Sequence, residues 1–248
     1  MAMIDRVLFR GPASADGESE RMTLLEHLEA LRRVLIISAL AMVVGSTVAF
    51  FFRDQMFLFL AHQAGIRKLY VLSPLGEVTA SLKLSVIVGA VIASPVILQQ
   101  IWWFISPGLH LHERRLALPL LVGSVAFFFM GIAFAVWALH LFIRILDSFG
   151  GGTVGYFPEF NSFLSFLLLL TVAFGFVFEL PVVLVALGLL RVITSKWLWQ
   201  HRFYWIIGLQ IVANLMTPGV DPITPQFLFI PLVLFYLGSI LVLRVLGR

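Results

Sequence analysis

Apolar residues gather in six long runs along the chain, separated by shorter polar stretches. The runs cover roughly Val34 to Phe52, Leu82 to Ile105, Leu116 to Phe142, Phe160 to Leu190, Phe203 to Met216 and Phe227 to Leu246. A transmembrane helix needs about 20 predominantly apolar residues, and all of these runs except the fifth approach or exceed that length. The pattern therefore predicts an all-α polytopic membrane protein with six transmembrane helices.

The fifth run is unusual because it holds only about 14 residues. At the helical rise per residue it spans roughly 21 Å, whereas the hydrocarbon layer is about 30 Å thick. We expect the bilayer to thin there, or the helix to lie in a recess lined by protein. Pro95 in the second run and Pro181 in the fourth predict kinks, which would bend the bundle.

The residues before the first run are polar and mixed in charge. This pattern predicts a flexible tail at residues 1–21, followed by a transmembrane domain at residues 22–248. Thr23 and Glu26 have the spacing of a capping box, which marks the start of a helix. Leucines follow at helical spacing, at Leu24, Leu28, Leu31 and Leu35. This pattern predicts a short amphipathic helix along the membrane surface before the first span.

The composition of the chain supports this class. It is 60% apolar and 12% charged, with a mean hydropathy of +1.02, values that do not describe a water-soluble domain. Cysteine is absent, which excludes disulfides, thiolate metal sites and thiol nucleophiles together.

The distribution of basic residues predicts the orientation in the membrane. An even number of spans puts both termini on one side. If that side is the cytoplasm, its segments hold 12 of the 17 basic residues, namely Arg6, Arg10, Arg21, Arg32, Arg33, Arg114, Arg115, Arg191, Lys196, Arg202, Arg244 and Arg248. The positive-inside rule therefore favours cytoplasmic termini.

Glu179 is the only charged residue between Phe160 and Leu190. About eleven residues separate it from Arg191, which places it roughly 16 Å deep at the helical rise. A charge at that depth costs on the order of 2.5 to 3.5 kcal/mol on insertion scales, so an acid there is a functional candidate. A purely structural role, a hydrogen bond to Gln210, Gln99 or a backbone carbonyl freed by Pro181, remains compatible with it.

Further polar residues have two interpretations each. Gln210 and Asn214 lie four apart on one face of the short fifth run, which favours interhelical hydrogen bonding over pore lining. Glu113 is either a local partner of the arginines that follow it or a binding residue. A metal site formed by His110, His112 and Glu113 is disfavoured by those arginines.

Two other functional classes can be weighed from the sequence. A secondary transporter would use the proline-interrupted spans, but Glu179 is the only ionisable residue at depth, and a substrate pathway usually needs several. An intramembrane protease would need an Asp within a span or a histidine near a buried serine such as Ser124, and neither pattern occurs. The glycines at 150–152 lack the lysine of a phosphate-binding loop and predict a turn.

Several short motifs resemble the TatC family, the polytopic components of the twin-arginine protein translocase, and the resemblance runs from Thr23 to Leu246. The motifs occur in order, at matching positions of a six-span layout. They are His27 to Arg32; Ser94 to Gln100 with Phe104, Pro107 and His112 to Arg115; Phe174 to Pro181; and Thr217-Pro218 with Asp221.

The resemblance implies a receptor and not an enzyme, with no catalytic residue, metal or cofactor. Such proteins bind the paired-arginine signal peptides of folded cargo proteins at the cytoplasmic face of the cell's inner membrane. They assemble with the single-span partners TatA and TatB, and the protonmotive force drives export. We also expect self-association in the receptor complex and no binding of nucleic acid.

The resemblance also assigns roles to particular residues. Glu113 matches the family's acid in the first cytoplasmic loop and Phe104 its neighbouring aromatic residue, and Glu26 and Glu29 are the nearby acids of the N-terminal helix. Carboxylates suit this task because two guanidinium groups are always charged and match carboxylate geometry. Glu179 matches a buried acid implicated in contact with partner helices, and we include Gln210, Asn214 and Asp221 in that predicted contact.

The chain departs from the family pattern at three places. Ala30 occupies a position before Leu31-Arg32 where the family often has a second acid. Leu237 follows Tyr236 where the family commonly has a glutamate, and Asp221 is displaced relative to the family's double proline. The signal-reading site is therefore expected to rely on Glu26 or Glu29.

Overall fold

The structure, a computed structural model, describes residues 24–63, 73–105, 117–148, 159–217 and 224–247, and these residues form a bundle of helices. The predicted all-α class is confirmed. In chain order the helices are α2 (Leu24–Phe51), α3 (Arg53–Gln63), α4 (Gly76–Ile105), α5 (Ala117–Ser148), α6 (Phe160–Phe178), α7 (Leu180–Leu189), α8 (Ser195–Gln200), α9 (Arg202–Met216) and α10 (Thr224–Val245).

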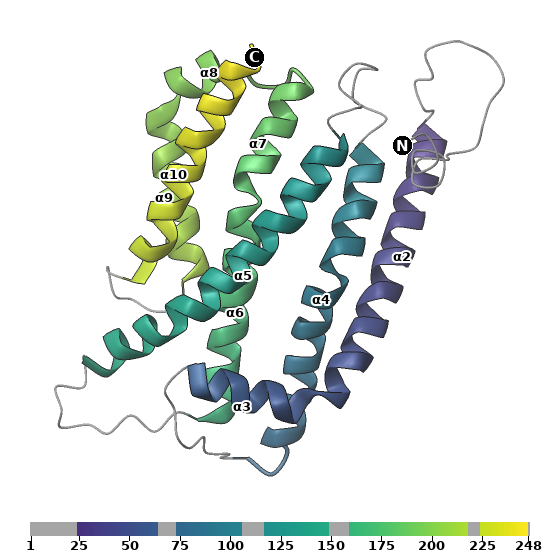
Figure 1. Ribbon diagram of the computed structural model, residues 1–248, viewed down its shortest axis with the longest axis vertical. Helices are drawn as coiled ribbons and strands as arrows, with labels where there is room; N and C mark the ends of the chain where they lie inside the picture. The colour runs from purple at the N-terminus through teal and green to yellow at the C-terminus, as the bar shows by residue number, and fades with distance from the viewer. Residues whose placement is uncertain (1–23, 64–72, 106–116, 149–158, 218–223, 248) are drawn as a thin grey trace.

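Figure 1 shows how the long helices are arranged. Helices α2 and α4 lie side by side at one edge of the bundle, and α9 and α10 form the opposite edge. Helix α5 runs obliquely between the two edges and packs against α6. Helix α2 begins and α10 ends at the same end of the bundle, at the top of the view.

The prediction of a separate amphipathic helix before the first span is wrong. Helix α2 runs without interruption from Leu24 to Phe51. No glycine or proline lies between Leu24 and Val44 to interrupt the backbone hydrogen bonds, so the polar first turns simply extend the apolar helix. The predicted tail of residues 1–21 and the capping residue Thr23 lie outside the described residues.

Helices α2 and α4 approach each other closely at two glycines. A Cβ atom on Gly45 would lie 2.5 Å from the carbonyl oxygen of Gly89, and a Cβ atom on Gly89 would overlap the backbone of Ser46. Only a residue without a side chain permits this distance between the two backbones. The glycine pair therefore fixes how α2 docks at the edge of the bundle.

The fourth apolar run forms two helices instead of one. Helix α6 ends at Phe178 and α7 begins at Leu180, with Glu179 between them and Pro181 in the first turn of α7. The kink predicted from Pro181 is confirmed, because proline has no N–H to continue the α6 hydrogen bonding. Pro95, by contrast, lies inside α4, which continues through it.

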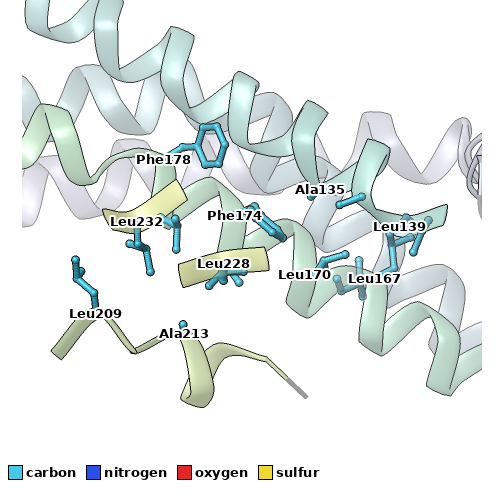
Figure 2. Close-up of a cluster of buried hydrophobic side chains, with 14 of the residues drawn as sticks. Ala135, Leu139, Leu167, Leu170, Phe174, Phe178, Leu209, Ala213, Leu228 and Leu232 are labelled. Carbon is cyan, nitrogen blue, oxygen red and sulfur yellow. The ribbon is translucent and has the colours of Figure 1, made fainter. Parts of the chain in front are cut away.

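The hydrophobic core lies where α5, α6, α9 and α10 meet. Figure 2 shows side chains from all four helices turned toward one another around Phe174. The ring of Phe174 is fully buried and lies 5.0 Å from that of Phe134. Aromatic pairs of this kind stabilise packing between helices in addition to the area that they bury.

Within the described parts of the chain, five helices or helix pairs are long and apolar enough to cross a membrane: α2, α4, α5, α6 with α7, and α10. The short fifth run forms α9, whose 15 residues extend roughly 22 Å at the helical rise. The sequence predicted six transmembrane helices; five long apolar ones are found, and the short fifth run forms the helix α9.

Helix α3 was not predicted. It lies across the end of the bundle opposite the start of α2, and none of its residues is buried. It is attached through Phe57, whose ring lies 4.7 Å from that of Phe160. Nearby, Glu159 caps α6 by accepting hydrogen bonds from the N–H groups of Ser162 and Asn161, and hydrogen bonds from these two residues hold the pKa of Glu159 below its usual value.

Candidate functional site

The start of α2 and the end of α4 meet at one end of the bundle. The ring of His27, in the first turns of α2, lies 4.3 Å from the ring of Phe104, near the end of α4, with an interplanar angle of 30°. Glu26 and Glu29 flank His27 and are exposed. Three of the four residues predicted to read the signal peptide are thus on adjoining helix ends.

A second contact joins the same two helix ends. The guanidinium carbon of Arg33 lies 5.6 Å from the centre of the Trp103 ring, which is the range of a cation–π interaction. Together with the His27 and Phe104 rings, this contact holds the first turns of α2 against α4. We call the surface formed by Glu26, His27, Glu29 and Phe104 the acidic end.

The acidic end combines carboxylates with an aromatic side chain. Exposed carboxylates accept hydrogen bonds from guanidinium groups in a bidentate geometry, and an aromatic ring offers a face for stacking. Glu26 also lies in the first turn of α2. Glu113, the fourth predicted residue, lies outside the described residues.

Glu179 lies deeper in the bundle, at the break between α6 and α7. It is 9% exposed, and its Oε1 atom has no hydrogen-bond partner among the residues that the structure describes. Its backbone is satisfied: its N–H donates to the carbonyl of Phe176 at 3.1 Å, and its carbonyl accepts from Val183 at 3.0 Å. The predicted burial of Glu179 is confirmed.

The partner of the Glu179 carboxyl comes from α5. The Ser124 side chain faces this carboxyl within interaction range, and the Ser124 oxygen accepts a hydrogen bond from the indole Nε1–H of Trp102 on α4 at 2.9 Å. Among the described residues, Glu179 forms no hydrogen bond to Gln210 or Gln99, the alternative partners expected from the sequence.

Three helices thus supply one polar cluster, Trp102, Ser124 and Glu179, within an otherwise apolar region. Aromatic packing lies beside this cluster, where the ring of Phe178 is 4.7 Å from that of Phe235 of α10. An unpaired carboxyl oxygen in such surroundings is costly unless it binds a proton or an outside donor. The cluster is suited to accept a hydrogen bond from a helix that docks beside it.

The last turn of α4 connects the two regions. Trp102 belongs to the polar cluster, whereas Phe104, two residues later, belongs to the acidic end. A shift of this turn would therefore move residues of both the polar cluster and the acidic end.

Gln210 and Asn214 were expected to form hydrogen bonds between helices, but among the described residues they bond to each other. The Gln210 Nε2 atom donates to Asn214 Oδ1 on the same helix, at 3.1 Å. The two side chains lie four residues apart, so one turn of α9 brings them together without a second helix. Gln210 is half-buried and Asn214 exposed. Asp221 lies outside the described residues.

Trp102 and Ser124 were not predicted from the sequence to belong to the site. The signal that could have found Ser124 is its position within an apolar run, where a hydroxyl needs a partner. The indole of Trp102 has a single N–H donor, which usually finds an acceptor when the ring is buried. Elsewhere in the described ranges, no group of three or more His, Cys, Asp or Glu residues could hold a metal ion.

Comparison with protein families gives one match over most of the chain. A family model described as "Sec-independent protein translocase protein (TatC)" matches residues 26–231. The acidic end and the polar cluster both fall within this range.

Individual relatives support the same assignment. A "Sec-independent protein translocase protein TatC" of Carboxydothermus hydrogenoformans is 36% identical over 230 residues, covering 92% of this chain and 95% of the relative. A protein with the same description from Aquifex aeolicus is 40% identical over 228 residues, covering 88% of this chain and 93% of the relative.

The fold is also similar to a solved structure described as "Crystal Structure of Twin Arginine Translocase Receptor- TatC". The TM-score is 0.78 at 37% sequence identity, with 90% of this chain and 100% of the other covered. The sequence comparisons and the fold comparison therefore indicate the same family along nearly the whole chain.

Proposed function

The chain belongs to the TatC family, the receptor proteins of the twin-arginine translocase for protein export, and from this premise we propose that it binds the paired arginines of signal peptides on folded cargo proteins. It is a multi-pass membrane protein of the transport class and not an enzyme. The proposal concerns which residues of this chain perform the recognition and which contact partners.

We assign recognition of the paired arginines to the acidic end together with Glu113. The observation that supports this most is the stacking of His27 on Phe104, which puts the acids of the first α2 turns beside the aromatic end of α4. A guanidinium group binds a carboxylate through two parallel hydrogen bonds, and lysine cannot reproduce that geometry. The acidic end therefore fits a pair of arginines better than a pair of lysines.

We assign contact with the single-span partners TatA and TatB to the polar cluster. The unpaired Oε1 atom of Glu179 supports this, because a polar residue on a docking helix would satisfy it. Gln210, Asn214 and Asp221 remain candidates for the same contact, and Asn214 is exposed on α9.

The proposed orientation places both termini and the acidic end in the cytoplasm, with α9 as a sixth, short crossing. The start of α2 and the end of α10 lie at one end of the bundle, as an even number of crossings requires. In this orientation, 12 of the 17 basic residues fall in segments that the sequence assigns to the cytoplasmic side. Cargo would then be recognised before export, which the protonmotive force would drive.

The secondary transporter considered from the sequence is disfavoured. Among the described residues, Glu179 is the only buried Asp or Glu. A substrate pathway through the bundle would need further convergent polar groups at that depth.

Binding of a signal peptide to the purified protein tests the proposal. A fluorescent peptide with paired arginines should bind, and a peptide with two lysines in their place should not. Glu113→Ala should weaken binding by roughly 1 to 3 kcal/mol, the range for a charge-assisted hydrogen bond, and added salt should weaken it too.

A matched control is Glu77→Ala. Glu77 is an exposed acid in the first turn of α4, at the other end of the helix from Phe104, so its removal should leave the affinity unchanged. Equal binding of the arginine and lysine peptides would contradict the proposal.

A further inference from the structure

Two arginines contact one tryptophan where α8, α9 and α10 meet. The guanidinium carbon of Arg202, the first residue of α9, lies 5.0 Å from the centre of the Trp199 ring, and that of Arg244, in the last turn of α10, lies 5.1 Å from the same ring. We propose that Arg202 and Arg244, held against Trp199, bind the phosphate headgroup of an anionic phospholipid. Neither residue belongs to the acidic end or to the polar cluster.

Further contacts join the three helices that carry these arginines and Trp199. The Tyr236 hydroxyl of α10 donates a hydrogen bond of 2.6 Å to the carbonyl of Leu198 in α8, and Leu198 is fully buried. The ring of Trp205 in α9 stacks on Tyr236 at 5.7 Å. These contacts join α8, α9 and α10, so both guanidinium groups are held against the same Trp199 ring before a ligand binds.

Neither Arg202 nor Arg244 forms an ion pair with another residue that the structure describes. From Leu180 to the last residue, the sequence contains only one acid, Asp221. Within the described residues the only ion pair joins Arg53 and Asp54, at the opposite end of the bundle. A phosphate would supply the missing negative charge, and two guanidinium groups match its oxygen atoms through paired hydrogen bonds.

Arg202 keeps donors available for such a ligand. Its Nη1 atom donates to the carbonyl of Trp199 at 3.0 Å, which fixes the guanidinium group, while a guanidinium carries five N–H donors in all. Its guanidinium carbon also lies 5.0 Å from the centre of the Phe203 ring. Aromatic rings on these sides reduce the hydration of the cation and strengthen its attraction to an anion.

The surroundings favour a lipid as the source of the phosphate. Phe203 is 67% exposed and Val245 is 81% exposed, so apolar side chains flank the arginines on both α9 and α10. Trp199 is 43% exposed, and tryptophan is enriched where headgroups meet acyl chains. A phospholipid can place its phosphate on the arginines and its acyl chains along these apolar side chains, whereas a free phosphate ion can use only the first contact.

Lipid binding to the purified protein tests this inference. The protein in neutral detergent is titrated with phosphatidylglycerol or phosphatidylcholine, and bound lipid is counted by native mass spectrometry. We expect the protein to prefer phosphatidylglycerol. Arg202→Gln and Arg244→Gln should each weaken its binding about fivefold, and the double variant about 25-fold, on the basis of the free energy typical of one basic side chain at an anionic surface. Arg202→Lys should recover only part of the affinity, because lysine lacks the planar fork.

Arg53→Gln is the matched control. The Arg53 guanidinium also lies over an aromatic ring, at 4.7 Å from Phe50, but Asp54 already pairs with it at 3.6 Å. Its removal should leave the preference for phosphatidylglycerol unchanged. Thermal unfolding of each variant in neutral detergent shows that the proteins compared are folded.

Three outcomes would overturn the inference. One is equal binding of both lipids by the unmodified chain. Another is an unchanged preference in the double variant, which would place any lipid site elsewhere. The third is full displacement of phosphatidylglycerol by millimolar inorganic phosphate, which would indicate a site for a free anion.

Discussion

At the scale of single residues, Glu179 is the buried acid of the bundle among the residues described. Its carboxyl lies among apolar and aromatic side chains, faces Ser124 and retains an unpaired oxygen. A carboxyl of this kind favours any state in which a further donor arrives. Because Ser124 lies on one side of the carboxyl, a further donor would have to reach the unpaired Oε1 atom from another side.

The first prediction concerns the polar cluster. Glu179→Ala should abolish export of a folded cargo and leave the affinity for the signal peptide unchanged, because the acidic end does not contain Glu179. Ser124→Ala should lower export several-fold, because a hydrogen bond to a charged group contributes about 1.5 to 3 kcal/mol. Export of the cargo into inverted membrane vesicles measures the effect of each substitution on transport.

Ser239→Ala is the control for Ser124→Ala. Ser239 is also buried, but its hydroxyl donates to the carbonyl of Phe235 on its own helix at 2.7 Å. Its loss should leave export unchanged. Normal export by the Glu179→Ala variant would show that the acid is only a tolerated core residue.

The second prediction concerns the departure at Ala30. Because α2 is a continuous helix, Glu26 and position 30 lie about 40° apart around it, whereas Glu29 is turned about 60° from Glu26 and about 100° from position 30. Ala30→Glu should tighten binding of the twin-arginine peptide by about 0.5 to 1 kcal/mol and partly rescue Glu26→Ala, while Ala30→Gln should do neither. If Glu29→Ala destroys binding and Ala30→Glu has no effect, Glu29 carries the role.

Some of the site could be predicted from the sequence, and the missing part has a physical explanation. Glu179 stands out because a charge in a long apolar run is rare. Its partner Ser124 could not be identified, because a serine in an apolar run gives no indication of which helix it faces. The sequence also could not show that Gln210 and Asn214 bond to each other, because spacing by four fits a bond within one helix as well as one to a neighbour.

At the scale of helices, α2 is held against the bundle by a close backbone contact that leaves no room for side chains. Helix α2 packs mainly against α4, and the two backbones meet at Gly45 and Gly89. Most of the other residues of α2 face outward. The position of the acidic end therefore depends on this one contact between two helices.

The third prediction tests that dependence. Gly89→Ala should destabilise the protein by about 1 to 3 kcal/mol, the range for inserting atoms into a packed contact, because the new Cβ would meet the backbone of Ser46. Gly238→Ala is the control: its Cβ would meet nothing within 4 Å, and stability should hold or rise slightly. Thermal unfolding in detergent measures both, and equal transition temperatures would contradict the account of this contact.

Helix boundaries differ in how well the sequence predicts them. The break at Glu179 followed from Pro181, whose missing N–H is a local property. Helix α3 was missed because it is amphipathic only weakly and is held by tertiary contacts such as Phe57 with Phe160. The prediction of a separate surface helix before the first span was wrong. The spacing of leucines alone does not distinguish a separate helix from the extension of a longer one.

At the scale of the whole molecule, the bundle has two ends of different chemistry. The end where α2 begins and α10 ends carries the acidic end and the arginines on Trp199. The opposite end carries α3 and the ion pair of Arg53 with Asp54. This asymmetry is what the proposed orientation in the membrane relies on.

The fourth prediction is the orientation itself. The chain contains no cysteine, so single cysteines at Ser14, His112, Gly151 and Gly219 each report one location. An impermeant thiol reagent added outside intact cells should label only the last two, because the positive-inside rule puts the others in the cytoplasm. The reverse labelling pattern would require the bundle to be inverted.

The central claim, that the acidic end reads the paired arginines, is tested most directly by crosslinking. A photoreactive group is attached to Ala30→Cys in one variant and to Glu77→Cys, at the other end of the bundle, in a second. A short labelled peptide carrying the paired arginines should crosslink only at position 30, and unlabelled arginine peptide, but not its lysine counterpart, should compete. Crosslinks that form equally at both positions, or that the lysine peptide removes as well, would contradict the claim.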